Sequence, residues 1–332
     1  MATTLSLGCW DYDRVRAMLD GRVAVDGFAL KPTVLPPSEI FARAFTEAPF
    51  DVSELSLSSY MLQVATGKCA YVAIPAFLSR AFRHGGIFVR GDRGIETPKD
   101  LEGRLVGVPE YQMTMAMWVR GILQDEHGVD FRKIHWRTGG LHRAGQKERL
   151  ALELPAAMDV EPIDAADTLD GLLVAGKLDA VVAPATPRSF LAGDADVRRL
   201  FADPVTAERA YYRKTGMFPI MHVVGVRRTI ADKHPDLAAD LFRAFVRARD
   251  IALAELKVTA EGSANRVTLP WLAAEWEATR ALMGDNPWTY GVAANLKELE
   301  AACRYSQEQN LAPRRLTVDE LFHPATRGLA DA

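Results

Sequence analysis

The stretch TPKDLEGRLVGVPEYQMTMAMWVRGILQDEHG, residues 97–128, indicates how the whole chain folds. It opens with a turn at residues 98–103, and the short apolar run that follows, residues 105–108, is typical of a buried strand. Pro109 ends that strand, because proline cannot donate to a central ladder. A helix with one apolar face comes next, and it ends at Gly128, where a left-handed residue is favoured. The stretch therefore reads as strand, polar turn and helix.

The polar turn before that helix is the first candidate binding site. Tyr111 and Gln112 precede the helix and Thr114 opens it. The start of a helix presents unpaired N–H groups and the positive end of the helix dipole, so a carboxylate would bind well there. Thr114 could instead be a simple cap, which is compatible with ligand binding. We expect all three residues to hydrogen-bond an anionic substrate.

The composition is that of an ordinary globular protein. The chain has 332 residues, enough for two domains, and 48% of them are hydrophobic. A net charge of -3 gives no indication of nucleic acid or a membrane as partner. Three widely separated cysteines argue against a disulfide framework. Neither a signal peptide nor a bilayer-spanning run is evident, so the expected location is the cytoplasm. The sequence leaves open whether the chain forms a homo-oligomer.

Strands and helices alternate along much of the chain. Further strands are expected at residues 28–34, 50–56, 71–75, 86–89, 134–136, 179–183 and 221–226. The last third reads as mostly helical, and Thr268 and Pro270 are expected as the N-cap and first turn of one helix. The alternation predicts two α/β domains with parallel sheets and helices on both faces.

The turn and strand of residues 98–108 resemble the entry to the second domain of type 2 periplasmic-binding-protein folds. Narrower motifs, in this order, resemble the 4,5-dihydroxyphthalate decarboxylase family: residues 80–84 (RAFRH), 108–114 (VPEYQMT), 118–123 (WVRGIL), 139–141 (GGL), 218–222 (FPIMH) and 288–291 (WTYG). The resemblance covers nearly the whole chain. Residues 142–146 (HRAGQ) depart from it, because an acidic residue and a Pro-Gly-Arg are expected there; this difference concerns the substrate's substitution pattern more than the fold.

The resemblance implies two α/β domains with the ligand in a cleft between them. Domain one would comprise residues 1–92 and 217–332, including a helical C-terminal segment, and domain two residues 93–216. The two crossings between the domains would lie near residues 89–94 and 215–219.

The implied reaction is decarboxylation of a dihydroxylated aromatic dicarboxylate such as 4,5-dihydroxyphthalate, giving 3,4-dihydroxybenzoate and CO₂. It needs a base near a ring hydroxyl, an acid near the ring carbon that loses its carboxylate, and cations for the other carboxylate. No Gly-rich phosphate loop is visible, so no organic cofactor is expected. A divalent metal held by Glu54, His84 and His222 is not excluded, although these residues show no fixed ligand spacing.

His222, His84 and Glu54 are the candidates for proton transfer. Histidine titrates near neutrality, and His222 lies beside the second predicted crossing. The sequence does not decide whether His222 gives or takes the proton. Each histidine could instead be a satisfied core residue, and Glu54 could simply pair with an arginine.

Arg80 and Arg83 are the expected carboxylate ligands, because a guanidinium binds a carboxylate through two parallel hydrogen bonds. They could instead form a solvated basic face. Ser58 and Arg188 complete the expected substrate contacts, since both lie near the carboxyl ends of strands that should face the cleft. Two rival functions fit the same fold: a solute-binding protein for an aromatic acid, and an enzyme acting on another hydroxylated aromatic acid.

Overall fold

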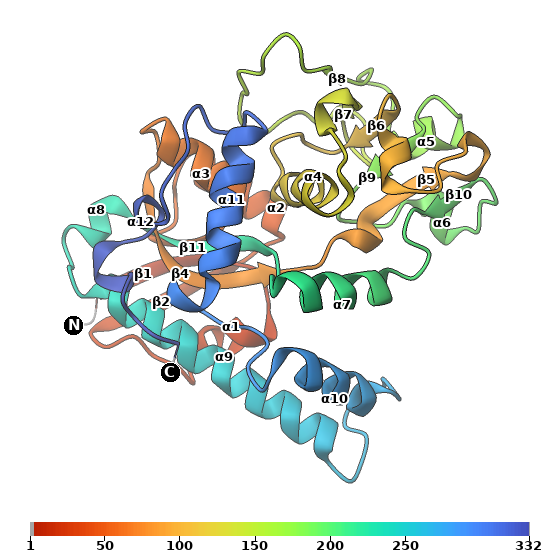
Figure 1. Ribbon diagram of the computed structural model, residues 1–332. Helices are drawn as coiled ribbons and strands as arrows, with labels where there is room; N and C mark the ends of the chain where they lie inside the picture. Colours follow the sequence, from red (N-terminus) through yellow and green to blue (C-terminus); the bar gives the residue numbers. More distant parts are fainter. Residues whose placement is uncertain (1–2, 332) are drawn as a thin grey trace.

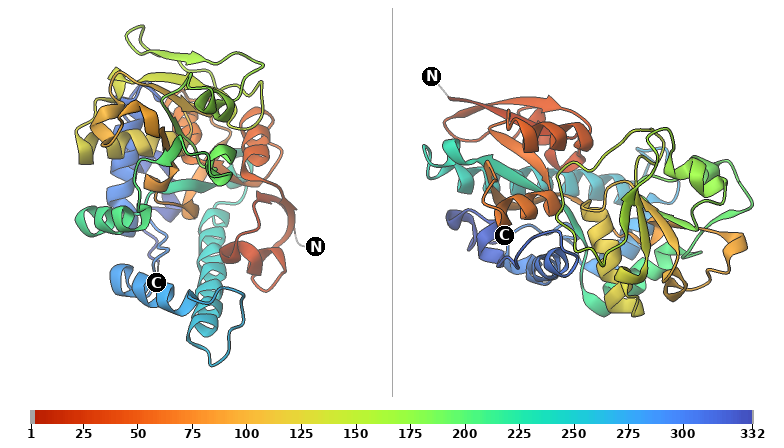
Figure 2. Two further views of the ribbon diagram at one scale, coloured as in Figure 1. Left: turned by 90° about the vertical axis from the view of Figure 1, so that its right-hand side faces the viewer. Right: turned by 90° about the horizontal axis from the view of Figure 1, so that it is seen from above.

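The strands form two separate sheets in the computed structural model, which describes residues 3–331 (Figure 1). A five-stranded sheet has the order β2-β1-β3-β11-β4, and a six-stranded sheet has the order β10-β5-β9-β6-β7-β8. Helices pack on each sheet, so the chain forms two α/β lobes, as the alternation predicts (Figure 2). We call them the first lobe, which contains the five-stranded sheet, and the second lobe.

The first lobe takes both ends of the chain. Its strands are β1 (Thr3–Cys9), β2 (Phe28–Val34), β3 (Val52–Ser56), β4 (Tyr71–Arg80) and β11 (Ile220–Arg227). Its helices are α1 (Asp13–Leu19), α2 (Pro37–Thr46), α3 (Leu57–Ala65), α8 (Arg228–Ala231), α9 (Leu237–Glu261), α10 (Leu272–Met283), α11 (Leu296–Glu308) and α12 (Val318–Leu321). The expected helical C-terminal segment is therefore present, and α9 packs on α1 and β4.

The second lobe is a single continuous piece of the chain. Its strands are β5 (Ile87–Arg90), β6 (Leu105–Val108), β7 (His135–Thr138), β8 (Val160–Pro162), β9 (Ala180–Val182) and β10 (Val197–Arg199). Its helices are α4 (Thr114–His127), α5 (Leu169–Val174), α6 (Arg188–Leu191) and α7 (Pro204–Thr215). Residues 97–128 contain β6 and α4, and Gly128 ends α4 with a left-handed φ of 63°.

Both sheets are mixed, which corrects the prediction of parallel sheets. β11 runs antiparallel to β3 and β4, and β5 runs antiparallel to β9 and β10. The reason lies in the crossings: β4 leaves the first lobe at the edge where β11 enters it, so the two strands must run in opposite directions. Parallel neighbours would need a longer crossover connection.

The first crossing joins β4 to β5 through residues 81–86, somewhat before the expected residues 89–94. β5 pairs only with second-lobe strands, so residues 87–90 belong to that lobe's sheet. The second crossing lies between α7 and β11, within the expected residues 215–219. The domain limits at residues 92 and 217 stay a prediction.

Helix α11 contacts both α3 of the first lobe and α4 of the second (Figure 1). Gly121 allows the close approach to α4, because a Cβ atom there would lie 2.4 Å from Cε2 of Tyr305. The Tyr305 hydroxyl donates to Asp125 at 2.5 Å, and Arg120 Nε donates to Gln309 Oε1 at 2.8 Å. α11 therefore ties the two lobes together.

One predicted helix start is wrong. α10 begins at Leu272, with Trp271 in the N-cap position, rather than after Thr268. Pro270 disfavours helical geometry at the residue before it, which delays the start.

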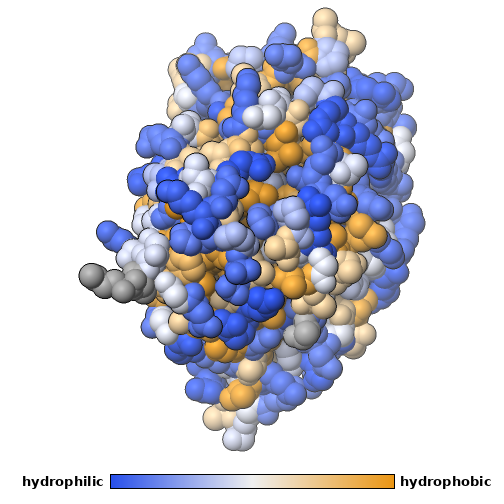
Figure 3. Space-filling model, turned by 90° about the vertical axis from the view of Figure 1, so that its left-hand side faces the viewer, coloured by the Kyte–Doolittle hydropathy of each residue, from blue (hydrophilic) through white to orange (hydrophobic). Residues whose placement is uncertain are grey.

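On the face shown in Figure 3, hydrophobic residues are scattered among hydrophilic ones. Within residues 3–331, the helices are all too short or too polar to cross a membrane.

Candidate active site

A histidine and a glutamate form the centre of the site, and the pairing of β11 with β3 brings them together. His222 lies opposite Ser56 and Val224 lies opposite Glu54, so Glu54, Ser56 and His222 project from one face of the first-lobe sheet. His222 Nδ1 lies 2.6 Å from Glu54 Oε1. An ionised carboxylate only accepts hydrogen bonds, so we assign the proton to Nδ1. Nε2 is then the ring nitrogen available for chemistry.

Glu54 is fully buried and is held by two further donors. The Tyr12 hydroxyl donates to Glu54 Oε1 at 2.7 Å, and the backbone N–H of Trp10 donates to Oε2 at 3.0 Å. Burial, and then the charge of Glu54, raise the pKa of Tyr12, so the phenol remains a donor. Tyr12 is a site residue that the sequence prediction missed, although residues 9–11 just before it follow a strand end.

An aromatic ring lies between the imidazole and a guanidinium. Phe41 of α2 packs edge-on against His222, with ring centroids 4.8 Å apart. The guanidinium carbon of Arg149 lies 5.3 Å from the Phe41 ring centroid. Arg149 therefore places a positive charge one ring away from the Glu54–His222 pair.

Arg149 contacts both lobes and was not predicted from the sequence. Its Nη2 donates to Glu110 Oε1 of the second lobe at 2.9 Å, and its Nη1 donates to Ser59 Oγ of the first lobe at 3.3 Å. It comes from an irregular segment between β7 and β8, residues 142–159, which we call the long loop. The only sequence signal there is the departure from the family pattern at residues 142–146.

The starts of helices α3 and α4 meet between the lobes. The Thr114 hydroxyl lies 3.0 Å from Ser56 Oγ and accepts from the backbone N–H of Ser58 at 3.1 Å. Ser58 Oγ donates to the Gln112 carbonyl, and Ser59 Oγ donates to Gln112 Oε1 at 2.9 Å. The structure thus brings together Ser58, Gln112 and Thr114 from the predicted set. The hydroxyl of Thr114 bonds across the lobes and makes no cap bond to its own helix.

Tyr111 faces away from these residues with its side chain. Its ring packs under the guanidinium of Arg120 at 3.7 Å and against Trp136, with ring centroids 6.1 Å apart. Only its backbone N–H reaches toward the long loop, where it donates to Glu148. A substrate contact by Tyr111 would therefore come from its main chain.

The two predicted carboxylate-binding arginines are in different situations. Arg80 is buried, its Nη atoms donate to the carbonyls of Phe218 and Thr289 at 2.9 Å, and Nη2 also bonds Asn295. Its Nη donors are thus occupied by the protein itself, while Nε has no partner within residues 3–331. Arg83 makes one bond within residues 3–331, from Nε to Met221 Sδ at 3.3 Å, and burial lowers the pKa of Arg83 to about 10.

His84 and Arg188 lie apart from the Glu54–His222 pair. His84 packs against Phe201 and Tyr211 beside a hollow of about 220 Å³, and burial lowers the pKa of His84 to about 4. Arg188 begins α6, its backbone N–H donates to Asp170 at 2.9 Å and its side chain is exposed. Neither residue bonds Glu54 or His222 in the described part of the chain, and their predicted roles stay predictions.

A hollow of about 530 Å³ lies between α2 and the long loop; Arg149 lines it and lies against Phe41, which in turn packs on His222. Its lining includes the cations Arg143, Lys147 and Arg149 and the carboxylates Glu39 and Glu110. We call this hollow the mouth.

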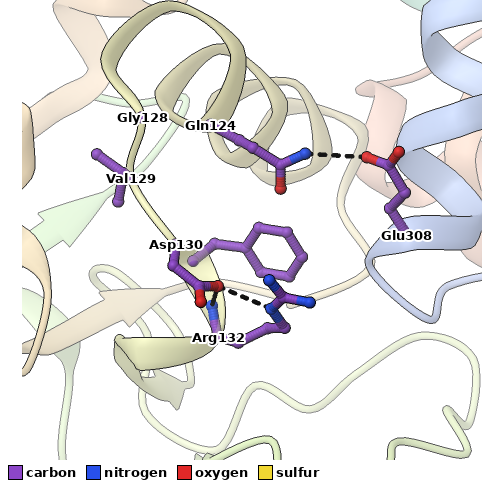
Figure 4. Close-up of a pocket in the computed structure, with 7 residues that line it drawn as sticks. Gln124, Gly128, Val129, Asp130, Arg132 and Glu308 are labelled. Atoms are coloured by element: carbon purple, nitrogen blue, oxygen red, sulfur yellow. Dashed lines mark hydrogen bonds and ion pairs between the residues drawn. The ribbon is translucent and has the colours of Figure 1, made fainter.

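Another hollow, of about 470 Å³, lies between the end of α4 and Glu308 of α11 and contains no predicted site residue (Figure 4). Across residues 3–331, no three His, Cys, Asp or Glu side chains are grouped to hold a metal ion.

Comparison with known proteins shows which family the chain belongs to. No family model matches the chain. A 4,5-dihydroxyphthalate decarboxylase of Comamonas testosteroni is 41% identical over 322 residues, covering 97% of each chain. A 4,5-dihydroxyphthalate decarboxylase of Pseudomonas putida is 44% identical over 209 residues, covering 63% of this chain and 81% of the relative.

Solved structures support the fold at lower identity. The periplasmic aliphatic sulphonate-binding protein SsuA of Escherichia coli aligns with a TM-score of 0.55 at 14% identity, covering 97% of this chain and 98% of its own. The alkanesulfonate-binding protein SsuA of Xanthomonas axonopodis pv. citri aligns with a TM-score of 0.53 at 15% identity over the same shares. These likenesses show a periplasmic-binding-protein-like fold, and the sequence identity to the two decarboxylases shows that the chain belongs to the 4,5-dihydroxyphthalate decarboxylase family.

Proposed function

We propose that this protein decarboxylates 4,5-dihydroxyphthalate to 3,4-dihydroxybenzoate and CO₂ by protonating the aromatic ring. The observation that carries the proposal is the pair formed by the buried Glu54 and the half-buried His222, whose Oε1 and Nδ1 atoms lie 2.6 Å apart on β3 and β11 of the first-lobe sheet. Full-length identity to a decarboxylase of that substrate supports the substrate.

In the proposed reaction, His222 is the acid. The hydroxyl para to the departing carboxylate gives its proton to solvent water, and its electron pair moves into the ring. The ring carbon that bears the carboxylate then takes a proton from Nε2 of the imidazolium form of His222, which becomes neutral. The bond to that carboxylate breaks, CO₂ leaves, and the bonding pair restores aromaticity and gives a phenolate; the phenolate and His222 then regain protons from water. Glu54 supports His222 as the acid, because a buried carboxylate beside the imidazole ring compensates the positive charge of the imidazolium and fixes its orientation.

Arg149 is the proposed ligand for the carboxylate that remains. Its side chain is 11% exposed, and its partners Ser59 and Glu110 come from different lobes, so it lies at the interface where a ligand would bind. Arg80 is a weaker candidate, because its Nη donors are already bonded to the protein. Phe41 provides an apolar surface beside His222 for the substrate ring.

Incubation of the purified protein with 4,5-dihydroxyphthalate tests the proposal. We expect CO₂ release and, in D₂O, one deuterium at the ring carbon that lost its carboxylate. A parallel reaction with a chelator asks whether a divalent metal takes part. Binding without turnover would instead favour a solute-binding role, and turnover of a different hydroxylated acid would change the substrate. The expected cytoplasmic location belongs to this proposal, and cell fractionation tests it.

A further inference from the structure

A carboxylate of the protein occupies the turn that precedes α4. Glu148 of the long loop accepts hydrogen bonds from the backbone N–H groups of Tyr111 and Gln112, the latter at 3.4 Å. Consecutive N–H groups in the turn just before a 14-residue helix, near the positive end of its dipole, form a site that favours an anion. The occupant is internal, and it comes from a loop without regular secondary structure.

A second observation indicates that this site suits a larger anion than one side chain. Gln112 is only 1% exposed, yet its Nε2 has no hydrogen-bond partner within residues 3–331. Arg149, next to Glu148 in the chain, brings a guanidinium to the neighbouring Glu110. The turn therefore holds two backbone donors, an unused amide donor and a nearby cation.

The internal carboxylate is only weakly stabilised as an anion. Burial raises the pKa of Glu148 to about 7, and the negative charge of Glu110 acts in the same direction. The N–H groups of Tyr111 and Gln112 and the cation of Arg120 oppose the rise. Glu148 therefore changes charge near neutrality, where it faces Glu110 and Arg120 and lies beside Arg149.

We infer that Glu148 is a displaceable placeholder, whose carboxylate occupies the subsite for one carboxylate of the aromatic dicarboxylate substrate. The inference rests on the proposed function for the identity of that ligand. When substrate enters through the mouth, Glu148 leaves the N–H groups of Tyr111 and Gln112, and the long loop moves with it. Residues 143–147 and Arg149 line the mouth, so departure of Glu148 also widens the entrance.

Phthalate separates binding from catalysis, because it carries the two adjacent carboxylates but no hydroxyl to drive decarboxylation. Its affinity is measured by calorimetry at pH 6 and pH 8 for the parent, Glu148→Ala and Glu148→Gln. Glu153→Gln is the matched control, because Glu153 is an exposed residue of the same loop without a hydrogen bond or ion pair among the described residues.

We expect Glu148→Ala to bind phthalate about tenfold more tightly than the parent at pH 8, the effect of removing one charged competitor for the same donors. The advantage should shrink at pH 6, where Glu148 is mostly protonated and competes less. Glu153→Gln should match the parent at both pH values. Comparing variants at each pH cancels the titration of phthalate itself.

Weaker binding by a folded Glu148→Ala would overturn the inference, since Glu148 would then be building the site rather than filling it. An advantage that is equal at both pH values would also contradict it. If Glu148→Ala does not fold, Glu148→Gln decides, because it keeps the shape and removes the charge; we expect several-fold tighter binding at pH 8. Turnover of 4,5-dihydroxyphthalate is assayed separately, so failure of the proposed function is distinguishable from failure of this inference.

Discussion

The two helix starts that meet between the lobes have the same local plan and different degrees of completion. In β3, just before the start of α3, Glu54 accepts three hydrogen bonds, from Tyr12, Trp10 and His222. After β6, Glu110 Oε2 and Gln112 Nε2 are buried without partners within residues 3–331. The carboxylate beside the start of α3 is fully hydrogen-bonded. The turn before α4 instead has polar atoms without partners, and it binds the carboxylate of Glu148 from the long loop.

This difference separates two tasks. A group that transfers a proton must be held in one orientation before the substrate arrives, which the closed set of bonds around Glu54 provides. A group that binds substrate must have donors or acceptors to spare, because the ligand completes them. Under the proposed function, the first lobe supplies the chemistry and the turn of the second lobe supplies recognition. Four tests of this division follow from the structure.

The largest effect is expected at the completed start. His222→Asn keeps a hydrogen-bonding side chain but cannot shuttle a proton, so kcat should fall by roughly 10²–10⁴. Glu54→Gln should lose activity to a similar degree, because an amide does not fix the Nδ1–H tautomer in the same way. Steady-state kinetics measures the loss, and phthalate binding should stay near the parent value. His234→Asn is the control, since His234 packs on Phe28. Normal turnover by His222→Asn together with loss in His84→Asn would move the role to His84.

The second test weakens the packing of α4, the helix that follows the recognition turn, against α11. Gly121→Ala puts a Cβ atom 2.4 Å from the Tyr305 ring, so α4 must shift away from α11. The cost should be about 1–3 kcal/mol of unfolding free energy, which denaturant titration measures. Gly328→Ala is the matched control, because a Cβ atom there meets nothing within 4 Å. Equal stability of the two variants would mean that α11 does not hold α4.

The third test concerns the cation at the interface. Arg149→Lys keeps the charge but loses the planar fork, so KM should rise about tenfold while kcat changes little. Arg143→Lys, in the same mouth but exposed, should leave both constants unchanged. Arg80→Lys should reduce stability rather than raise KM, because its Nη donors hold Phe218 and Thr289. An unchanged KM in Arg149→Lys would remove Arg149 from the substrate site.

The smallest effect is expected where the two starts touch. Thr114→Val removes the hydroxyl that bonds Ser56 and Ser58. The interaction free energy between the starts of α3 and α4 should fall by about 1 kcal/mol. KM should rise a few-fold, and Thr114→Ser should restore it because the oxygen returns. If Thr114→Ser and Thr114→Val behave alike, the methyl group rather than the hydroxyl is what matters.

Local signals in the sequence are enough to predict the elements and part of the site. Apolar periodicity and Gly128 define β6 and α4, and strand ends that share an edge predict that Ser58, Gln112 and Thr114 gather. His222 and Glu54 belong to the same prediction, because both lie on strands expected to face the cleft. Their direct pairing comes from the register of β11 against β3, which no local pattern specifies.

The remaining site residues depend on contacts between distant segments. Tyr12 meets Glu54 across 42 positions, and Arg149 comes from a loop without periodicity that a pattern could reveal. Arg80 shows the converse, because its sequence neighbours favour a basic patch while its guanidinium meets Asn295, 215 positions away. Such residues are placed by tertiary packing, which overrides the local tendency of charged side chains to face water.

The position of α11 sets how reactants can enter and leave. Proteins of this architecture that carry solutes open by swinging their lobes apart. Here such a swing would break the bonds of Tyr305 to Asp125 and of Gln309 to Arg120, and would pull α11 from either α3 or α4. Traffic through the 530 Å³ mouth leaves those bonds intact. The bonds of α11 therefore favour entry and exit of ligands by movement of the long loop over separation of the two lobes.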